Sequence, residues 1–259
     1  MRKIPKRTHT LGVEHLAVKL LQEAAETSPT DMLNLKDTFV IVPAYSEEPV
    51  IRGVVEQLCN LFPHVVIVND GSSDNTLMTL RALPVTIINH AINLGQGAAL
   101  QTGLTYALSK GASYIVTFDS DGQHRVEDAV AAVRQIKAEG CDAICGSRFL
   151  GKAAVNIPRL RKLMIKTAVL FSNTTMGTTL TDTHNGLRAL SRKAAACIDI
   201  SQSGMAHASE IISQLMHHRM NIKEVPVQIN YTAYSLSKGQ SSLNAINIVF
   251  DLLIGRFLK

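Results

Sequence analysis

One stretch of the sequence decides the fold class: Tyr114-Ile115-Val116-Thr117-Phe118-Asp119-Ser120-Asp121-Gly122-Gln123-His124. Its first five residues are β-branched or aromatic and predict a buried strand, and the polar turn after them leads into a predicted helix over residues 126–139. The same alternation extends to both sides. Further strands are predicted at 38–42, 65–68, 85–88 and 142–145, and further helices near 47–62, 74–82 and 95–110. Continuous apolar strands that alternate with helices predict an α/β fold with a mostly parallel central sheet and helices on both faces.

The composition agrees with one large domain of this class. The chain has 259 residues, of which 46% are hydrophobic and 18% charged, and its formal net charge is +5. These values exclude intrinsic disorder, and 16 Gly and 8 Pro exclude a long coiled coil. The isoelectric point near 9.1 fits a phosphate-rich ligand, an anionic membrane surface or nucleic acid. With no Trp and 5% aromatic residues, the chain is poor in base-stacking side chains, so nucleic acid is not an expected partner.

Three segments differ in their sequence pattern. Residues 1–36 form a basic extension with a helix predicted near 12–26, residues 37–240 carry the α/β pattern, and residues 241–259 predict an amphipathic helix. No apolar core follows the basic start, so a secretory signal is not predicted, and no apolar stretch reaches the ~18–20 residues that span a bilayer. The cysteines lack paired spacing and are expected to be core thiols in a reducing cytoplasm. They are Cys59, Cys141, Cys145 and Cys197.

The candidate site consists of the residues that follow each predicted strand, because ligands bind beyond the carboxyl ends of parallel strands. These segments concentrate carboxylates and glycine-bearing turns, at residues 43–48, 69–74, 93–99 and 119–124. Acidic groups at one edge of a sheet repel each other unless a cation or a ligand lies between them. His124 and His184 lie beside the motif loops and are candidates for phosphate or acceptor contacts.

Asp119 and Asp121 are the strongest single feature. Two carboxylates one residue apart, just past a buried strand, can both reach a hard divalent cation, Mg²⁺ or Mn²⁺, and Gln123 adds a neutral oxygen on the same side. Such a cation would bridge to substrate phosphates. The structural alternative is an Asx-turn that leads into the helix over 126–139.

The turns after the second and third strands give weaker signals. Asp70 lies in a tight turn and is expected to be spare, so its carboxylate could accept hydrogen bonds from a base or a ribose. Gly95-x-Gly97 matches half of a dinucleotide fingerprint, but Leu100 stands where the third glycine is required. An NAD site is therefore not expected, and the small residues would let the helix over 95–110 pack closely.

Taken together, the motifs resemble family-2 inverting glycosyltransferases, and among them the dolichol-phosphate mannose synthases and bacterial polyprenyl-phosphate glycosyltransferases. The resemblance covers about residues 38–240. It rests on segments that occur in the family's order, at 42–48, 69–76, 93–97, 119–124, 146–149, 182–188 and 224–227.

The resemblance implies a GT-A-type nucleotide-sugar-binding fold and a metal-dependent hexosyltransferase with a UDP- or GDP-linked donor. It implies that the nucleotide contacts Pro43, Ala44, Tyr45, Glu47, Asp70, Gly97 and Asp119. It implies that the metal binds Asp119, Asp121 and Gln123, with Asp121 required for catalysis. Anionic phosphates of the donor or acceptor would contact Arg148, Arg161 and Lys238.

Several positions depart from the family's pattern. Ser46 replaces an asparagine, Asn69 an aspartate, and Ile165 a serine of the acceptor-phosphate segment, while Thr232 and Ser235 replace an arginine and a glycine. The lipid-linked acceptor therefore stays open between a polyprenyl phosphate and a hydroxyl of a glycolipid or polysaccharide.

The acceptor decides whether a base is needed. A phosphate is already a nucleophile, whereas a hydroxyl needs a general base, for which Asp182 and then Glu210 are the candidates. Two other functional classes stay open. One is a non-catalytic relative that binds a nucleotide sugar or a membrane partner, and the other is a nucleotidyltransferase, although residues 43–48 lack the glycine-rich, basic loop expected of it.

The C-terminal segment predicts attachment to a membrane surface. On a helix, residues 243–259 align their apolar side chains in one stripe, and Arg256 and Lys259 at the end can meet anionic headgroups. This predicts a cytoplasmic protein, peripheral on the cytoplasmic face of a membrane. The alternative is that the helix packs on the catalytic domain or on a second subunit of a homo-oligomer.

Overall fold

The computed structural model describes residues 35–151, 159–204, 206–230 and 234. The chain divides into two units, residues 1–36 and residues 37–259, and the sheet belongs to the second. The helices predicted near 12–26 and over 241–259 lie outside the described residues.

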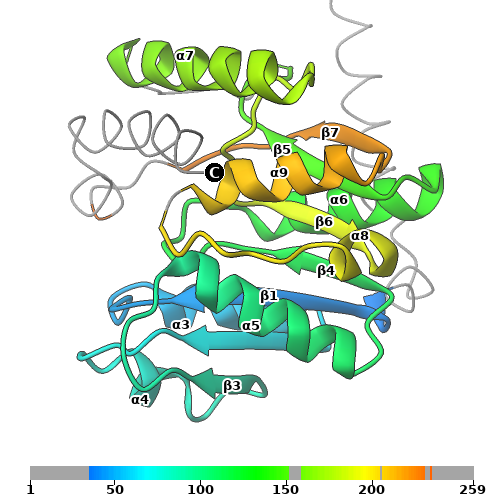
Figure 1. The fold of residues 1–259 in the computed structure, drawn as a ribbon. Coiled ribbons are helices and arrows are strands. Elements are labelled where there is room, and N and C mark those ends of the chain that lie inside the picture. Colours follow the sequence, from blue (N-terminus) through cyan, green and yellow to red (C-terminus); the bar gives the residue numbers. More distant parts are fainter. Residues whose placement is uncertain (1–34, 152–158, 205, 231–233, 235–259) are drawn as a thin grey trace, which may run out of the picture. The chain divides into compact units, whose positions relative to one another are not determined.

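Strands and helices alternate along most of the second unit (Figure 1). The strands are β1 (Thr38–Ala44), β2 (His64–Asn69), β3 (Thr86–Asn89), β4 (Tyr114–Thr117), β5 (Ala143–Ser147), β6 (Arg188–Ser191) and β7 (Ile222–Pro226). The helices are α3 (Ile51–Cys59), α4 (Thr76–Leu80), α5 (Gln96–Ser109), α6 (Val126–Glu139), α7 (Arg159–Met176), α8 (Arg192–Ala196) and α9 (His207–His217).

The strands form one sheet in the order β3-β2-β1-β4-β6-β5-β7. All pairings are parallel except those of β6, which runs antiparallel to both of its neighbours, β4 and β5. The predicted mostly parallel sheet is therefore confirmed, with one reversed strand near its middle.

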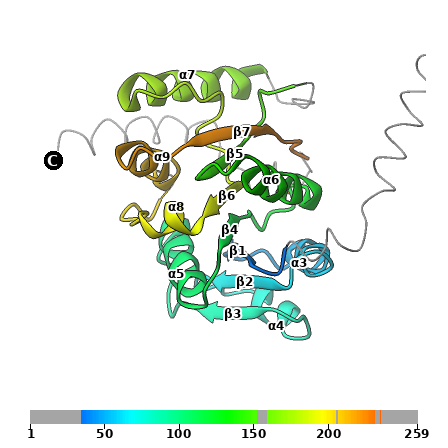
Figure 2. The ribbon, with the colours of Figure 1, turned by 90° about the vertical axis from the view of Figure 1, so that its right-hand side faces the viewer.

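Helices cover both faces of the sheet, as predicted (Figure 2). α5, α8 and α9 lie on one face, and α3 and α6 lie on the other. Ile41, Val66 and Ile115 of the strands and Leu104 of α5 belong to one buried apolar cluster. Burial of apolar strand residues against helices on both faces explains why their sequences are continuous apolar runs.

α5 packs closely against its surroundings, in agreement with the expectation from its small residues. A Cβ atom at Gly103 would overlap the side chain of Ile41 in β1. At the other end of the helix, a Cβ atom at Gly97 would overlap the carbonyl oxygen of Gln202, and the Gly97 N–H donates to the carbonyl of Ser203 at 3.1 Å. Gly97 therefore serves helix packing.

Some element boundaries differ from the sequence pattern. The helix expected from residue 47 begins at Ile51, because the carbonyl of Glu47 accepts from the N–H groups of Val50 and Ile51 and so forms a turn. α4 ends at Leu80, ahead of Pro84, which disfavours a helical conformation in the residue before it. All four cysteines are free thiols, and Cys141 and Cys145 are buried.

Candidate functional site

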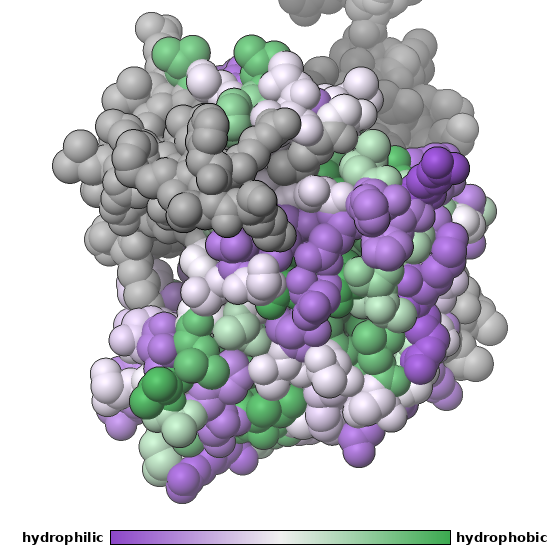
Figure 3. All heavy atoms as spheres, in the orientation of Figure 1, coloured by the Kyte–Doolittle hydropathy of each residue, from purple (hydrophilic) through white to green (hydrophobic). Residues whose placement is uncertain are grey.

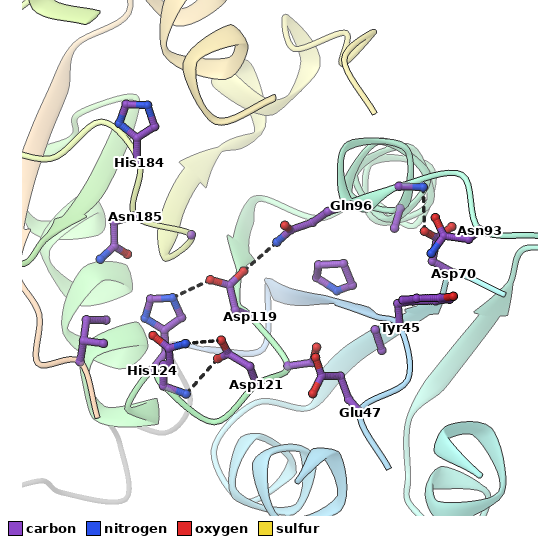
Figure 4. Close-up of a pocket in the computed structure, with 18 of the residues that line it drawn as sticks. Tyr45, Glu47, Asp70, Asn93, Gln96, Asp119, Asp121, His124, His184 and Asn185 are labelled. Carbon is purple, nitrogen blue, oxygen red and sulfur yellow. Dashed lines mark hydrogen bonds and ion pairs between the residues drawn. The ribbon is translucent and has the colours of Figure 1, made fainter. Parts of the chain in front are cut away.

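A cavity of about 500 Å³ opens at the carboxyl ends of the parallel strands. Most of the residues expected at the site line it (Figure 4). They are Pro43, Ala44, Tyr45, Glu47, Asp70, Asp119, Asp121, Gln123, His124, Arg148 and His184. Asn93, Gln96, Asn185, Gly186 and Ile229 also line the cavity, although the sequence did not mark them individually as site residues.

Among the described residues, Gly97, Asp182 and Glu210 were expected at the site but do not line the cavity. Gly97 faces residues 202–203, and the neighbouring Gly95 lines the cavity in its place. Arg161 lies in α7. Lys238 lies outside the described residues.

The two aspartates at the centre of the cavity are held by different partners (Figure 4). Asp119 accepts a hydrogen bond from Nε2 of Gln96 at 3.0 Å, and its other oxygen lies 2.9 Å from Nε2 of His124. Asp121 accepts from the backbone N–H of Gln123 at 3.0 Å and from its side-chain amide at 2.6 Å. The Asx-turn offered as the alternative to a metal site is therefore present, and it leaves both carboxylates on the cavity.

The surroundings shift the pKa values of Asp119 and Asp121 in opposite directions. Burial and the neighbouring charge of Asp119 raise the pKa of Asp121 to about 6. Burial also opposes ionisation of Asp119, but the hydrogen bond and charge of His124 hold the pKa of Asp119 below its usual value. Asp119 and Asp121 repel each other when both carboxyl groups are ionised, and a bound cation would relieve that repulsion.

Gly186 fits directly against Asp119. A Cβ atom at this position would overlap the Asp119 carboxylate. The Gly186 carbonyl accepts a hydrogen bond from Oγ1 of Thr117 at 2.6 Å, which ties the segment before β6 to β4. Only glycine leaves space for the carboxylate here, so Gly186 sets where Asp119 lies.

Asp70 is not spare, in contrast to the expectation from the sequence. Its carboxylate accepts from the backbone N–H groups of Leu94 at 2.9 Å and Gly95 at 2.8 Å, and it lies 2.7 Å from Nδ1 of His90. These bonds fix the loop that enters α5. Asp70 lines the cavity, and its carboxylate shapes this wall through the loop that it holds.

Tyr45 and Glu47 form the rim beside Asp70. The Tyr45 side chain is 47% exposed, whereas Glu47 is buried. Oη of Tyr234 donates to the Glu47 carboxylate at 2.9 Å, and the N–H of Glu47 donates to Oγ1 of Thr76 at 2.8 Å. The residue between them, Ser46, has a φ of 54°, in the left-handed region that a non-glycine residue rarely adopts.

The surroundings of Asp182 and Glu210 argue against a general base at either position. Asp182 is fully buried and forms a bidentate pair with Arg148, at 2.6 Å to Nε and 2.7 Å to Nη2. Burial alone would raise the pKa of Asp182, but the Arg148 guanidinium outweighs it and the pKa is lowered. Glu210 accepts from the N–H groups of Ser201 and Gln202 and does not belong to the cavity lining.

His184 is an uncharged histidine at the cavity wall. Its Nδ1 lies 2.9 Å from Oγ1 of Thr183 and its Nε2 3.4 Å from Oγ of Ser209. Burial lowers the pKa of His184 to about 4, and the guanidinium charges of Arg148 and Arg188 act in the same direction. The ring is therefore neutral at physiological pH.

The donor set at the centre fits Mg²⁺ or Mn²⁺ in the way these ions bind with a phosphate substrate. Among the described residues, no group of three or more His, Cys, Asp and Glu side chains could hold a metal ion. Mg²⁺ typically takes one or two protein carboxylates together with substrate phosphates and waters. Asp119 and Asp121, with the amide oxygen of Gln123, offer this kind of incomplete oxygen site.

The comparisons with known proteins agree with this geometry. The model of the family "Glycosyl transferase family 2" matches residues 39–199. The UDP-N-acetylglucosamine–dolichyl-phosphate N-acetylglucosaminyltransferase of Methanococcus voltae is 31% identical over 83% of this chain and 94% of that protein. The polyprenol monophosphomannose synthase of Mycolicibacterium smegmatis is 29% identical over 85% of this chain and 88% of that protein.

A solved structure shares the fold. Glucosyl-3-phosphoglycerate synthase of Mycobacterium tuberculosis, in complex with Mn²⁺, UDP and glucosyl-3-phosphoglycerate, superposes with a TM-score of 0.64 at 17% identity, over 86% of this chain and 81% of that chain. This likeness confirms the GT-A-type fold. The match over residues 39–199 shows that the chain belongs to glycosyl transferase family 2 and is a glycosyltransferase.

Proposed function

We propose that this glycosyltransferase moves a hexosyl group from a UDP- or GDP-linked donor to a polyprenyl or dolichyl phosphate, with Mg²⁺ or Mn²⁺ as its cofactor. The names of the two relatives support the acceptor class. The Mn²⁺ and UDP bound to the protein of similar fold support the cofactor and the donor class.

The proposal rests mainly on the order in which different kinds of side chain line one cavity (Figure 4). Tyr45 and Asp70 line one end, the Asp119–Asp121 pair lies in the middle, and His184 lines the other side. We assign the first end to the nucleoside, the carboxylates to the metal and diphosphate, and the region of His184 and Arg148 to the sugar and the acceptor phosphate.

Asp119, Asp121 and Gln123 would hold the cation. When bound there, it would supply positive charge to the nucleoside diphosphate as that group leaves. Arg148, although paired with Asp182, presents its guanidinium at the cavity wall, and fixed hydrogen-bond donors of this kind stabilise the negative charge that develops during transfer.

A phosphate acceptor fits this site better than a hydroxyl acceptor. A hydroxyl needs a base to remove its proton, and Asp182 is committed to Arg148 while Glu210 holds residues 201–202. A phosphate monoester carries its nucleophilic oxygen already ionised. Of the two acceptors open at the level of sequence, we therefore propose the phosphate.

Because the proposed acceptor is a lipid, we also propose that the enzyme binds peripherally to the cytoplasmic face of a membrane. No helix among the described residues is long and apolar enough to cross a bilayer. α7 exposes Leu163 and Leu170 together with Lys162 and Lys166, and apolar residues are visible over this helix at the top of Figure 3. Apolar and cationic side chains on one exposed helix are suited to peripheral binding of anionic lipid.

The experiment combines a panel of UDP- and GDP-hexoses and Mn²⁺ with polyprenyl phosphate, or with the corresponding polyprenol as the matched control. We expect one donor to release its nucleoside diphosphate only when polyprenyl phosphate is present, with a glycolipid whose sugar–phosphate bond is cleaved by mild acid. Equal release with polyprenol, or no release with any donor, would contradict the proposal.

A further inference from the structure

A chain of hydrogen-bonded polar groups runs from β7 to the cavity, through the buried carboxylate of Asp182. Glu224 of β7 pairs in register with Cys145 of β5, at one edge of the sheet (Figure 1). Its carboxylate accepts from the backbone N–H of Thr181 at 2.9 Å, from Oγ1 of Thr181 at 2.9 Å, and from the N–H of Asp182 at 3.0 Å. Glu224 thereby fixes the backbone on either side of the Thr181–Asp182 peptide bond.

The second link joins Asp182 to Arg148. Besides the two bonds from the guanidinium, the backbone N–H of Arg148 donates to Oδ2 of Asp182 at 3.1 Å, and the N–H of His184 donates to Oδ1 at 3.3 Å. Oγ of Ser147 and Oγ1 of Thr181 lie 2.6 Å apart and join the same two segments. The Asp182 carboxylate is thus used entirely by its own chain, and its side chain has no exposed surface.

The third link is Arg148 itself. It lines the cavity, and 13% of its side chain is exposed. A bidentate pair of this kind uses two of the five N–H donors of a guanidinium and fixes the plane of the group. Of the two partners, Arg148 alone is placed to meet a ligand.

We infer that Glu224 and Asp182 are positioning residues, which act in series to hold the Arg148 guanidinium in the orientation that binds the acceptor phosphate. This inference rests on the proposed function. It gives Asp182 a role different from the general base considered from the sequence, and it gives Glu224, about forty residues further along the chain, a role at the site.

Two simpler accounts make different predictions. If Asp182 were a general base, its replacement would remove turnover while acceptor binding stayed intact. If the ion pair served stability only, replacements would lower the melting temperature and leave the folded enzyme's affinity unchanged. A positioning role instead weakens phosphate binding more than it lowers kcat, since a misplaced cation costs affinity and orientation.

The test uses the full-length enzyme with Asp182→Asn, Glu224→Gln and Thr181→Val. Lys223→Gln is the matched control, because Lys223 is the neighbour of Glu224 in β7 and its partner, Glu139, lies in α6. The readouts are the affinity for a fluorescent isoprenyl monophosphate in detergent, the affinity for UDP with Mn²⁺, and kcat at saturating polyprenyl phosphate. Thr181→Val preserves every charge and keeps the test valid if Asp182→Asn fails to fold.

We expect Asp182→Asn to weaken binding of the isoprenyl monophosphate on the order of tenfold, and Glu224→Gln and Thr181→Val severalfold, with UDP affinity and kcat within about threefold of wild type. In an Arg148→Lys background, Asp182→Asn should add little, because the two act as one unit.

Loss of kcat in Asp182→Asn with unchanged monophosphate binding would overturn the inference. So would variants of Glu224 and Thr181 that behave like Lys223→Gln. If the wild-type protein binds UDP but neither binds the isoprenyl monophosphate nor glycosylates polyprenyl phosphate, the proposed function itself fails and the inference falls with it.

Discussion

Among single residues, Gly186 has the most direct effect on the site, because its close approach to Asp119 determines where that carboxylate lies. Because an added Cβ would overlap the carboxylate, Gly186→Ala must displace Asp119. We expect this variant to lose at least about tenfold in Mn²⁺-dependent affinity for the nucleotide, UDP or GDP, that the wild type binds, since sites of this kind tolerate displacements of well under 1 Å. Isothermal titration with that nucleotide measures the effect.

The matched control is Gly204→Ala, another loop glycine, around which a Cβ would meet no atom within 4 Å. This variant should bind the same nucleotide with the affinity of the wild type. A Gly186→Ala protein with unchanged affinity would show that the position of Asp119 is not set by this contact.

His184 provides a pH prediction at the same scale. Its pKa is about 4 in the folded protein and about 6.5 in an unfolded chain, so the unfolded state binds the proton more tightly between these values. Wild-type protein therefore loses stability as the pH falls through this window. His184→Gln removes the linkage, and between pH 7.5 and pH 5 the free energy of unfolding should fall by up to ~2 kcal/mol less in the variant than in wild type.

Chemical denaturation at the two pH values measures that difference. His218→Gln, which replaces an exposed histidine at the end of α9, is the control and should follow wild type. Parallel pH dependence in His184→Gln and wild type would contradict the lowered pKa of the half-buried His184.

The sequence predicted which residues reach the cavity better than it predicted their partners. Asp119, Asp121 and Gln123 follow a strand directly, and local pattern is enough to place them. The roles of Asp70 and Asp182 depend on partners 24 and 34 residues away, Leu94 and Arg148. The sequence does not show whether a carboxylate faces a ligand or binds groups of its own chain. Asp70 and Asp182 were therefore both expected to be free to act on a ligand.

At the level of elements, the apolar runs predicted β1 to β5, because strands in a sheet covered on both faces carry continuous apolar sequence. β6 and β7 were not predicted. β7 runs parallel to β5, but its sequence includes Lys223 and Glu224 and is not a continuous apolar run. β6 has four residues and includes Arg188, which is 1% exposed. A short segment with a buried charge resembles a loop, and its strand conformation follows from pairing with β4 and β5.

We predict that α7 contacts anionic lipid through its exposed leucines. Leu163 and Leu170 are 64% and 65% exposed and lie two turns apart on the helix. Replacing both with glutamate should weaken binding to vesicles that contain anionic lipid, because it removes apolar area and adds repulsion. Co-sedimentation measures the bound fraction.

Met78→Glu is the control for α7, since Met78 is 57% exposed on α4 and the substitution changes the charge in the same direction. It should leave vesicle binding intact. Equal binding by wild type and the double variant would mean that α7 does not meet the lipid.

At the scale of the whole molecule, the reversal of β6 explains which site residues the sequence missed. Residues that follow parallel strands gather at one edge of the sheet, and this rule located the segments after β1, β2 and β4. Because β6 runs the opposite way between β4 and β5, the residues at that edge are those that precede it. Asn185 and Gly186, which the sequence missed, reach the cavity for this reason, as does His184, which the motif beside it had already indicated. The direction of β6 was not readable from the local pattern.

We propose above all that Asp119 and Asp121 form, with a divalent cation, the diphosphate site of a nucleotide-sugar enzyme. The most direct measurement is calorimetric binding of UDP and GDP to wild type and Asp121→Ala, each with Mn²⁺ and with excess EDTA, with Lys223→Gln as the folded control. We predict that wild type and Lys223→Gln bind one of the two nucleotides in Mn²⁺, and that EDTA or Asp121→Ala weakens this binding at least about tenfold. Equal nucleotide affinity in Mn²⁺ and EDTA, or in wild type and Asp121→Ala, would contradict the claim.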